Sequence, residues 1–123
     1  MAVKDKRKSP RIDSLNLISY VVYDEADNAI RQGMGRTLNI SKTGICLDTY
    51  KPLSRRQKVA LTIGLKDDLV SIIGHVVHVR KRKNGRFDNG IDFVEIDQNH
   101  QSVLSNFLAA YYKLKNTDQS HPD

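Results

Sequence analysis

The sequence has little that could cross-link the chain or carry it through a membrane. Cys46 is the single cysteine among 123 residues, so an internal disulfide is excluded and a reducing compartment is favoured. No apolar run approaches the length needed to span a bilayer. The first residues are charged and no apolar segment follows them, which argues against a secretory signal. We therefore expect a cytoplasmic protein without a membrane span.

Patterns typical of enzymes are also missing. His75 and His78 stand three residues apart in a predicted strand, which places them on opposite faces, where they could not share a metal ion. The sequence has no nucleophile elbow, no phosphate-cradling glycine loop and no obvious pair of carboxylates. We therefore expect a protein that is not an enzyme and that holds neither a metal nor a cofactor.

Positive charge is in excess, with 20 Lys and Arg against 14 Asp and Glu and a net charge of +6. Basic side chains form two blocks, one near the amino terminus (Lys4, Lys6, Arg7, Lys8 and Arg11) and one at residues 80–83 (Arg-Lys-Arg-Lys). The excess indicates an anionic partner, and nucleic acid, anionic lipid and a phosphorylated small molecule all agree with it. We interpret the block at 80–83 as a solvated sheet edge whose charges discourage aggregation.

From about residue 15 the sequence alternates as β-strands do, most clearly at Val59, Leu61, Ile63 and Leu65. The dipeptide at 84–85, Asn-Gly, signals a tight hairpin, and the period becomes helical after Asp97, a candidate helix cap. Six strands (15–23, 33–40, 45–48, 59–65, 70–83 and 86–96) and one helix predict an all-β, six-stranded antiparallel barrel closed by a C-terminal helix. We expect a flexible basic arm over 1–12, barrel and helix over 13–115, and a disordered tail over 116–123.

The predicted strand over residues 33–40 has one irregular position. Alternation buries Leu38 and Ile40 and turns Thr37 and Asn39 to the other face. Arg36 then falls on the buried side, which predicts either a bulge or a place at the barrel rim.

Two short motifs carry most of the functional information, and the first is Arg7-Lys8-Ser9-Pro10-Arg11. Pro10 biases Ser9 away from helical geometry. In an extended chain Arg7 and Arg11 then stand up to about 13–14 Å apart at Cα, wide enough to grip a small dinucleotide from two sides. The planar guanidinium also matches the O6 and N7 edge of guanine with two parallel hydrogen bonds.

The second motif covers residues 39–44, Asn-Ile-Ser-Lys-Thr-Gly. Asn39 and Ser41 stand two residues apart, on the same face of a strand. Gly44 would let the backbone turn and approach a ligand closely. Taken alone, this pattern is also that of an ordinary Asx or Ser turn between strands, and R-x-x-x-R arises by chance in a basic chain.

In this order, and with Gly-Ile-Asp-Phe downstream at 90–93, the two motifs resemble those of the PilZ family of bacterial cyclic di-GMP receptors. The family's hallmark is R-x-x-x-R followed by (D/N)-x-S-x-x-G, ahead of a small β-barrel and a closing helix. The resemblance covers about residues 6–112, nearly the whole chain.

The resemblance implies a set of ligand-binding residues. Arg7 and Arg11 would clasp guanine and phosphate, Asn39 and Ser41 would hydrogen-bond base and backbone groups, and Gly44 would permit close approach. Lys6 stands where many relatives carry an arginine that stacks on an intercalated ligand dimer. Lysine keeps the charge but not the planar surface, so binding of one ligand molecule and of two both stay open.

The resemblance also implies a function. It describes a receptor that binds cyclic di-GMP, changes conformation and signals to an unidentified protein effector, with motility and biofilm control as the family's outputs. One rival is a small basic barrel that binds single-stranded nucleic acid, which the few aromatic residues disfavour. The other is a PilZ-like module that binds only protein, whose relatives usually lack one or both motifs. Effector, ligand affinity and oligomeric state have no readable pattern in the sequence.

Overall fold

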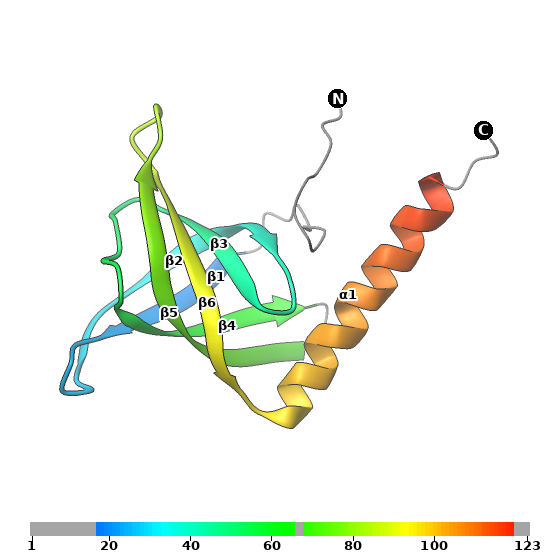
Figure 1. The fold of residues 1–123 in the computed structure, drawn as a ribbon, viewed down its shortest axis with the longest axis horizontal. Coiled ribbons are helices and arrows are strands. Elements are labelled where there is room, and N and C mark those ends of the chain that lie inside the picture. Colours follow the sequence, from blue (N-terminus) through cyan, green and yellow to red (C-terminus); the bar gives the residue numbers. More distant parts are fainter. Residues whose placement is uncertain (1–16, 66–67, 120–123) are drawn as a thin grey trace.

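Six antiparallel strands close into a barrel, and one helix packs against it (Figure 1). A computed structural model describes residues 17–65 and 68–119. The elements are β1 (Leu17–Tyr23), β2 (Ala29–Ile40), β3 (Gly44–Thr49), β4 (Lys58–Leu65), β5 (Asp68–Lys81), β6 (Phe87–Ile96) and α1 (Gln98–Gln119). Around the barrel the strands follow the order β1-β2-β3-β6-β5-β4, and β4 pairs with β1 to close it. The predicted fold class is confirmed.

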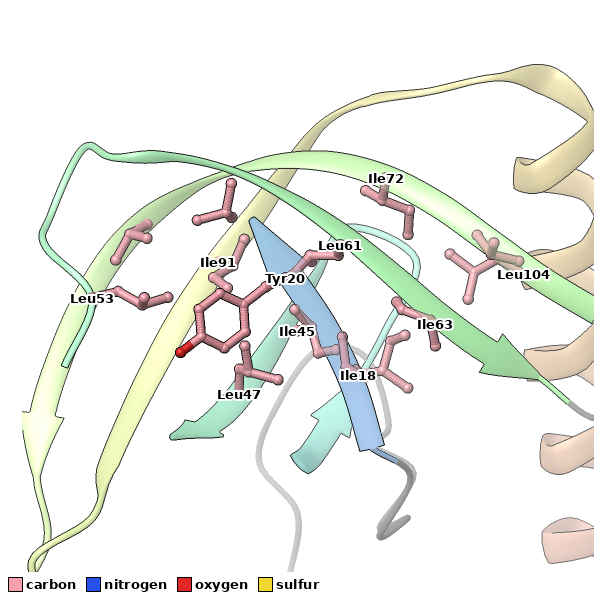
Figure 2. Close-up of a cluster of buried hydrophobic side chains, with 14 of the residues drawn as sticks. Ile18, Tyr20, Ile45, Leu47, Leu53, Leu61, Ile63, Ile72, Ile91 and Leu104 are labelled. Carbon is pink, nitrogen blue, oxygen red and sulfur yellow. The ribbon is translucent and has the colours of Figure 1, made fainter. Parts of the chain in front are cut away.

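Strict alternation in β4 shows how the sequence fills the barrel. Val59, Leu61, Ile63 and Leu65 are all buried, and the residues between them are half-buried on the outer side. Since successive strand residues point to opposite faces, one side of each strand supplies the core. Figure 2 shows the hydrophobic core inside the barrel, in which Leu104 of α1 joins side chains from the strands.

A β-bulge in β2 explains the irregular position in that strand. Thr37 pairs with Leu47 and Asn39 pairs with Cys46, so Leu38 is an extra residue without a partner in β3. Thr37 is consequently buried and Leu38 only half-buried. The prediction that Leu38 is buried and Thr37 faces outward was therefore wrong, because the bulge reverses the alternation at this point. Asn39 keeps its outward side.

Helix α1 begins at a conventional cap. The backbone N–H of His100 donates to Oδ1 of Asp97 at 2.8 Å, which satisfies one amide of the first turn, as predicted. Leu104 and Leu108 are buried where the helix packs against β5 and β4. The helix runs to Gln119, beyond the predicted boundary at residue 115.

Several predictions fall partly or wholly outside the described residues. These are the arm over residues 1–12 and the last residues, 120–123, of the predicted tail. Within the described ranges, no helix combines the length and apolar character that a membrane span requires.

Candidate functional site

The second motif forms the connection between β2 and β3, and its serine holds that connection in shape. The hydroxyl oxygen of Ser41 accepts the N–H of Thr43 at 3.2 Å, and the N–H of Ser41 donates to the carbonyl of Gly44 at 2.9 Å. The carbonyl of Thr43 accepts the N–H of Phe93 at 2.9 Å, which ties the turn to β6. The motif is thus a Ser turn braced by a neighbouring strand.

Gly44 is required by the close approach of β6. A Cβ built on Gly44 would lie 2.7 Å from the carbonyl oxygen of Ile91 and 3.6 Å from Oδ1 of Asp92. Real Cβ atoms do not come so near a backbone oxygen, so a larger residue would push the two strands apart. Gly44 has no left-handed backbone angle; among the described glycines only Gly85 does. Close approach of a ligand at Gly44 stays a prediction.

Asn39 is half-buried at the end of β2, directly after the bulge. Its side-chain amide has no hydrogen-bond partner among the residues whose side chains the structure describes. An amide of this kind offers two donors and one acceptor. Asn39 can therefore contact a ligand without losing a bond that the fold needs.

Strand pairing places other residues in one row with Asn39 across the sheet. Asn39 lies opposite Cys46, Cys46 lies opposite Gly90, and Gly90 lies opposite His78. Three strand spacings of about 4.8 Å separate the ends of this row, so it is roughly 14 Å wide. The imidazole of His78 covers Gly90, because a Cβ on Gly90 would clash with the ring atoms Nε2, Cδ2 and Cε1.

His78 was missed as a candidate because β5 contains a second bulge. Val76 pairs with Ile91 and His78 with Gly90, so Val77 is an extra residue. The predicted alternation breaks there, and His75 and His78 are both exposed. The prediction that they point to opposite faces was wrong. No three His, Cys, Asp or Glu side chains in the described part of the chain are grouped as metal ligands.

The remaining predicted ligand contacts, Lys6, Arg7 and Arg11, lie outside the described residues. Their placement beside Asn39 and Ser41 stays a prediction.

Arg82 of the second basic block joins an ion cluster around two buried carboxylates, while the other residues of the block are exposed. Asp48 and Asp88 are almost completely buried. Arg82 contacts both carboxylates at 3.3 Å, Arg80 contacts Asp88 at 2.9 Å, and Arg86 contacts Asp48 at 2.9 Å. The interpretation of the block as solvated is therefore wrong for Arg82, whose side chain is 28% exposed and compensates both buried carboxylates. Arg80, although it pairs with Asp88, is 75% exposed, and Lys81 and Lys83 are exposed as predicted. The cluster fixes the β5–β6 hairpin to β3.

Comparison with known proteins identifies one matching family. A family model for the PilZ domain matches residues 5–110. No sequence among the curated proteins matches significantly.

Solved structures share the fold at low sequence identity. The inhibitor of motility MotI/DgrA of Bacillus subtilis matches with a TM-score of 0.70 and 18% identity, over 91% of this chain and 53% of that one. The PilZ domain of YcgR from Escherichia coli, solved with c-di-GMP, has a TM-score of 0.66 at 10% identity, over 96% and 100% of the two chains.

MrkH of K. pneumonia, solved as a c-di-GMP complex, has a TM-score of 0.67 at 14% identity, over 97% of this chain and 56% of that one. The chain thus spans about half the length of MotI and MrkH.

Proposed function

The chain belongs to the PilZ domain family, and on that premise we propose that it is a receptor for cyclic di-GMP that signals to a partner protein. The observation that carries the proposal is the family match over residues 5–110, which includes both hallmark motifs. Two structures with the same fold, the PilZ domain of YcgR and MrkH, were solved with c-di-GMP. Their identity to this chain is low, so they support the fold and suggest the ligand.

The polar groups in the described part of the site suit this ligand. The amide of Asn39 has no partner within the described ranges, and guanine offers both acceptors and donors along its edges. The turn that carries Ser41 is braced by β6, so the motif is held in shape before a ligand arrives. Preorganised polar groups bind at a lower entropic cost than mobile ones.

Arg7 and Arg11 would complete the site from the amino-terminal side. Each guanidinium can form paired hydrogen bonds to guanine or to a phosphate oxygen pair. Lys6 would add positive charge near the phosphates. We propose that ligand binding orders residues 1–12 against the barrel and that an effector recognises the resulting surface. The protein would act in the cytoplasm and without catalysis.

The ion cluster favours this proposal over binding of single-stranded nucleic acid. Arg80, Arg82 and Arg86 are paired with Asp48 and Asp88. Fewer free cations therefore remain on the β5–β6 hairpin than the sequence alone suggests. Nucleic-acid grooves need unpaired cations and exposed aromatic rings together.

A calorimetric titration of the full chain with cyclic di-GMP tests the proposal. We expect saturable binding to the wild type and greatly reduced binding to Arg11→Ala. Lys81→Ala, which removes one exposed positive charge elsewhere, should bind like the wild type. The matching cyclic dinucleotide with adenine should bind more weakly, because its amino group replaces the O6 acceptor. Absence of binding to the wild type would contradict the proposal.

A further inference from the structure

A cleft lies on the barrel between the β1–β2 turn and the loop that joins β3 to β4. In Figure 1 both segments lie on the side of the barrel away from α1. The cleft has a volume of about 490 Å³. We call it the Arg56 cleft. It is lined by Tyr23, Asp24, Glu25, Asp27, Ile30, Arg55, Arg56, Gln57, Lys58 and His75.

Backbone strain is concentrated in this cleft. Two non-glycine residues in the described part of the chain have a positive φ, Asp27 at 65° and Arg56 at 71°, and both line the cleft. Aspartate tolerates this conformation, but for arginine it is strained and glycine would adopt it freely. The N–H of Arg56 donates to the carbonyl of Val76 at 2.7 Å, which holds the backbone in place. An arginine kept where glycine would be easier points to a role for its side chain.

The charges of the cleft are divided between its two walls. On the acidic wall, Asp27 pairs with Lys58 at 3.1 Å, and the ammonium of Lys58 lies 5.3 Å from the ring centre of Tyr23. On the basic wall, Arg55 and Arg56 are exposed and form no ion pair with any described residue. Two adjacent guanidiniums are thus available to an incoming anion.

Apolar surface lies beside these guanidiniums. Ile30 is 53% exposed and lines the cleft together with Tyr23. A free inorganic anion would gain nothing from Ile30. A nucleic-acid backbone carries a negative charge at every unit and could not keep all of them away from Asp24 and Glu25, whereas a peptide can confine its carboxylates to the side of Arg55 and Arg56. A peptide segment with acidic and apolar side chains matches the two guanidiniums, the apolar surface of Ile30 and Tyr23, and the separation of charge between the walls.

We propose that the Arg56 cleft binds an acidic segment of a partner protein. Carboxylates of that segment pair with Arg55 and Arg56, and an apolar side chain between them covers Ile30 and Tyr23. The partner's own basic groups face the acidic wall formed by Asp24 and Glu25.

The cleft is also connected to the ligand motif through the sheet. Gly44 lies opposite Asp92, Asp92 opposite His75, His75 opposite Lys58, and Lys58 opposite Tyr23. This single cross-strand row runs from the second motif into the cleft. Lys58 lies three strands from Gly44 in a closed barrel of six, so the row connects opposite sides of the barrel, and this link to signalling rests on the proposed function.

An NMR titration of the ¹⁵N-labelled full chain with a defined peptide tests the cleft. The probe is an acetylated and amidated hexapeptide of alternating Glu and Leu, and its control carries Gln in place of Glu. We expect amide shifts at residues 24–30 and 55–58, and at His75, with the Glu peptide only. Shifts centred on the hairpin at 81–86 would overturn the proposal, because they would indicate unspecific attraction to a basic protein. A single-stranded RNA that shifts the cleft amides when the peptide does not would overturn it too.

Arg56→Gly is the decisive variant, because it relieves strain and removes the proposed contact at once. We expect its affinity for the Glu peptide to fall about tenfold, while its melting temperature stays equal or rises. Lys81→Ala loses the same charge outside the cleft and should bind the peptide like the wild type. Unchanged peptide binding in Arg56→Gly, or a melting temperature lowered by several degrees, would overturn the proposal.

The outcome separates this inference from the receptor proposal. If cyclic di-GMP binds and the Glu peptide does not, the cleft assignment alone fails. If the peptide binds at the cleft and cyclic di-GMP does not bind, the receptor proposal alone fails.

Discussion

Asn39 and Ser41 differ in how far the fold already uses their side chains. The hydroxyl of Ser41 accepts a hydrogen bond within its own turn, whereas the amide of Asn39 has no partner among the described residues. We predict that Asn39→Ala weakens cyclic di-GMP binding by about 0.5–1.5 kcal/mol, roughly twofold to thirteenfold, and leaves the unliganded melting temperature unchanged.

Ser41→Ala is the comparison for this prediction. It should lower the melting temperature slightly and weaken binding less than Asn39→Ala. Calorimetry and thermal unfolding of both variants check it. Loss of stability in Asn39→Ala without loss of affinity would show that the amide is structural.

We expect Gly44 to determine the stability of the unliganded protein as well as any contact with a ligand. A methyl group there would meet the carbonyl oxygen of Ile91, so we predict that Gly44→Ala destabilises the unliganded protein by about 1–3 kcal/mol, as overpacking does. Gly64→Ala is the matched control, because its Cβ would meet only Leu69 Cδ2 at 3.8 Å. Urea unfolding measures both, and equal stability of the two variants would contradict the account.

At the scale of the elements, the ion cluster links the β5–β6 hairpin to β3. Asp48→Asn keeps the shape of the side chain and removes the charge opposite Arg82 and Arg86. Breaking a buried pair costs about 3–5 kcal/mol, and the partial exposure of both arginines reduces this to about 1–3 kcal/mol. We predict a loss of that size in urea unfolding.

Asp92→Asn is the control for the ion cluster, because Asp92 is exposed and has no ion pair in the described part of the chain. It should unfold at the same urea concentration as the wild type. A loss in Asp92→Asn as large as that in Asp48→Asn would contradict the role given to the cluster.

The β1–β2 turn predicts in which direction stability changes with pH. The N–H of Asn28, and then that of Ala26, donates to Oδ1 of Asp24 at 2.9 Å, which holds the pKa of this carboxyl below its ordinary value of 3.8. A depressed folded pKa contributes stability that is present above about pH 3.8 and lost as the pH falls through the folded pKa. The carboxyl carbon of Asp24 should titrate lower in the folded than in the urea-unfolded chain. An equal or higher midpoint would contradict this.

Elements whose signal is local could be predicted from the sequence, and elements that depend on pairing could not. The alternation of β4 and the Asp97 cap are complete within a few residues, so both were predicted. The bulges at Leu38 and Val77 arise from how two strands pair. The parity of Arg36 indicated a bulge in β2 as one of two alternatives without placing it, and no local pattern marks the bulge at Val77. For the same reason the sequence revealed Asn39 but not His78, which reaches the same surface across three strand spacings.

The ion cluster illustrates this limit for charges. Asp48 and Asp88 are 40 positions apart in the numbering and meet only because β3 pairs with β6. The sequence shows a basic block at 80–83, but its acidic partners become visible only when the strands are paired. Counting charges along the chain therefore overestimated the free positive surface.

At the scale of the whole molecule, the barrel connects two surfaces through one continuous sheet. The second motif occupies the connection from β2 to β3, and one cross-strand row leads from Gly44 to the Arg56 cleft. Ligand and partner would thus bind to separate sides of one continuous sheet. This arrangement suits an adaptor that holds its ligand and its partner at the same time, because both contacts rest on a rigid barrel.

Thermal unfolding of the full chain with cyclic di-GMP tests the central claim most directly. A ligand that binds only the folded protein, at a hundred times its dissociation constant, stabilises it by about 2.7 kcal/mol. For a domain of this size that raises the melting temperature by roughly 10 °C. We predict this shift for the wild type and its loss in Arg7→Ala and Arg11→Ala, whose unliganded melting temperatures stay unchanged. A wild type without a shift, or arginine variants that unfold early without ligand, would contradict the receptor account.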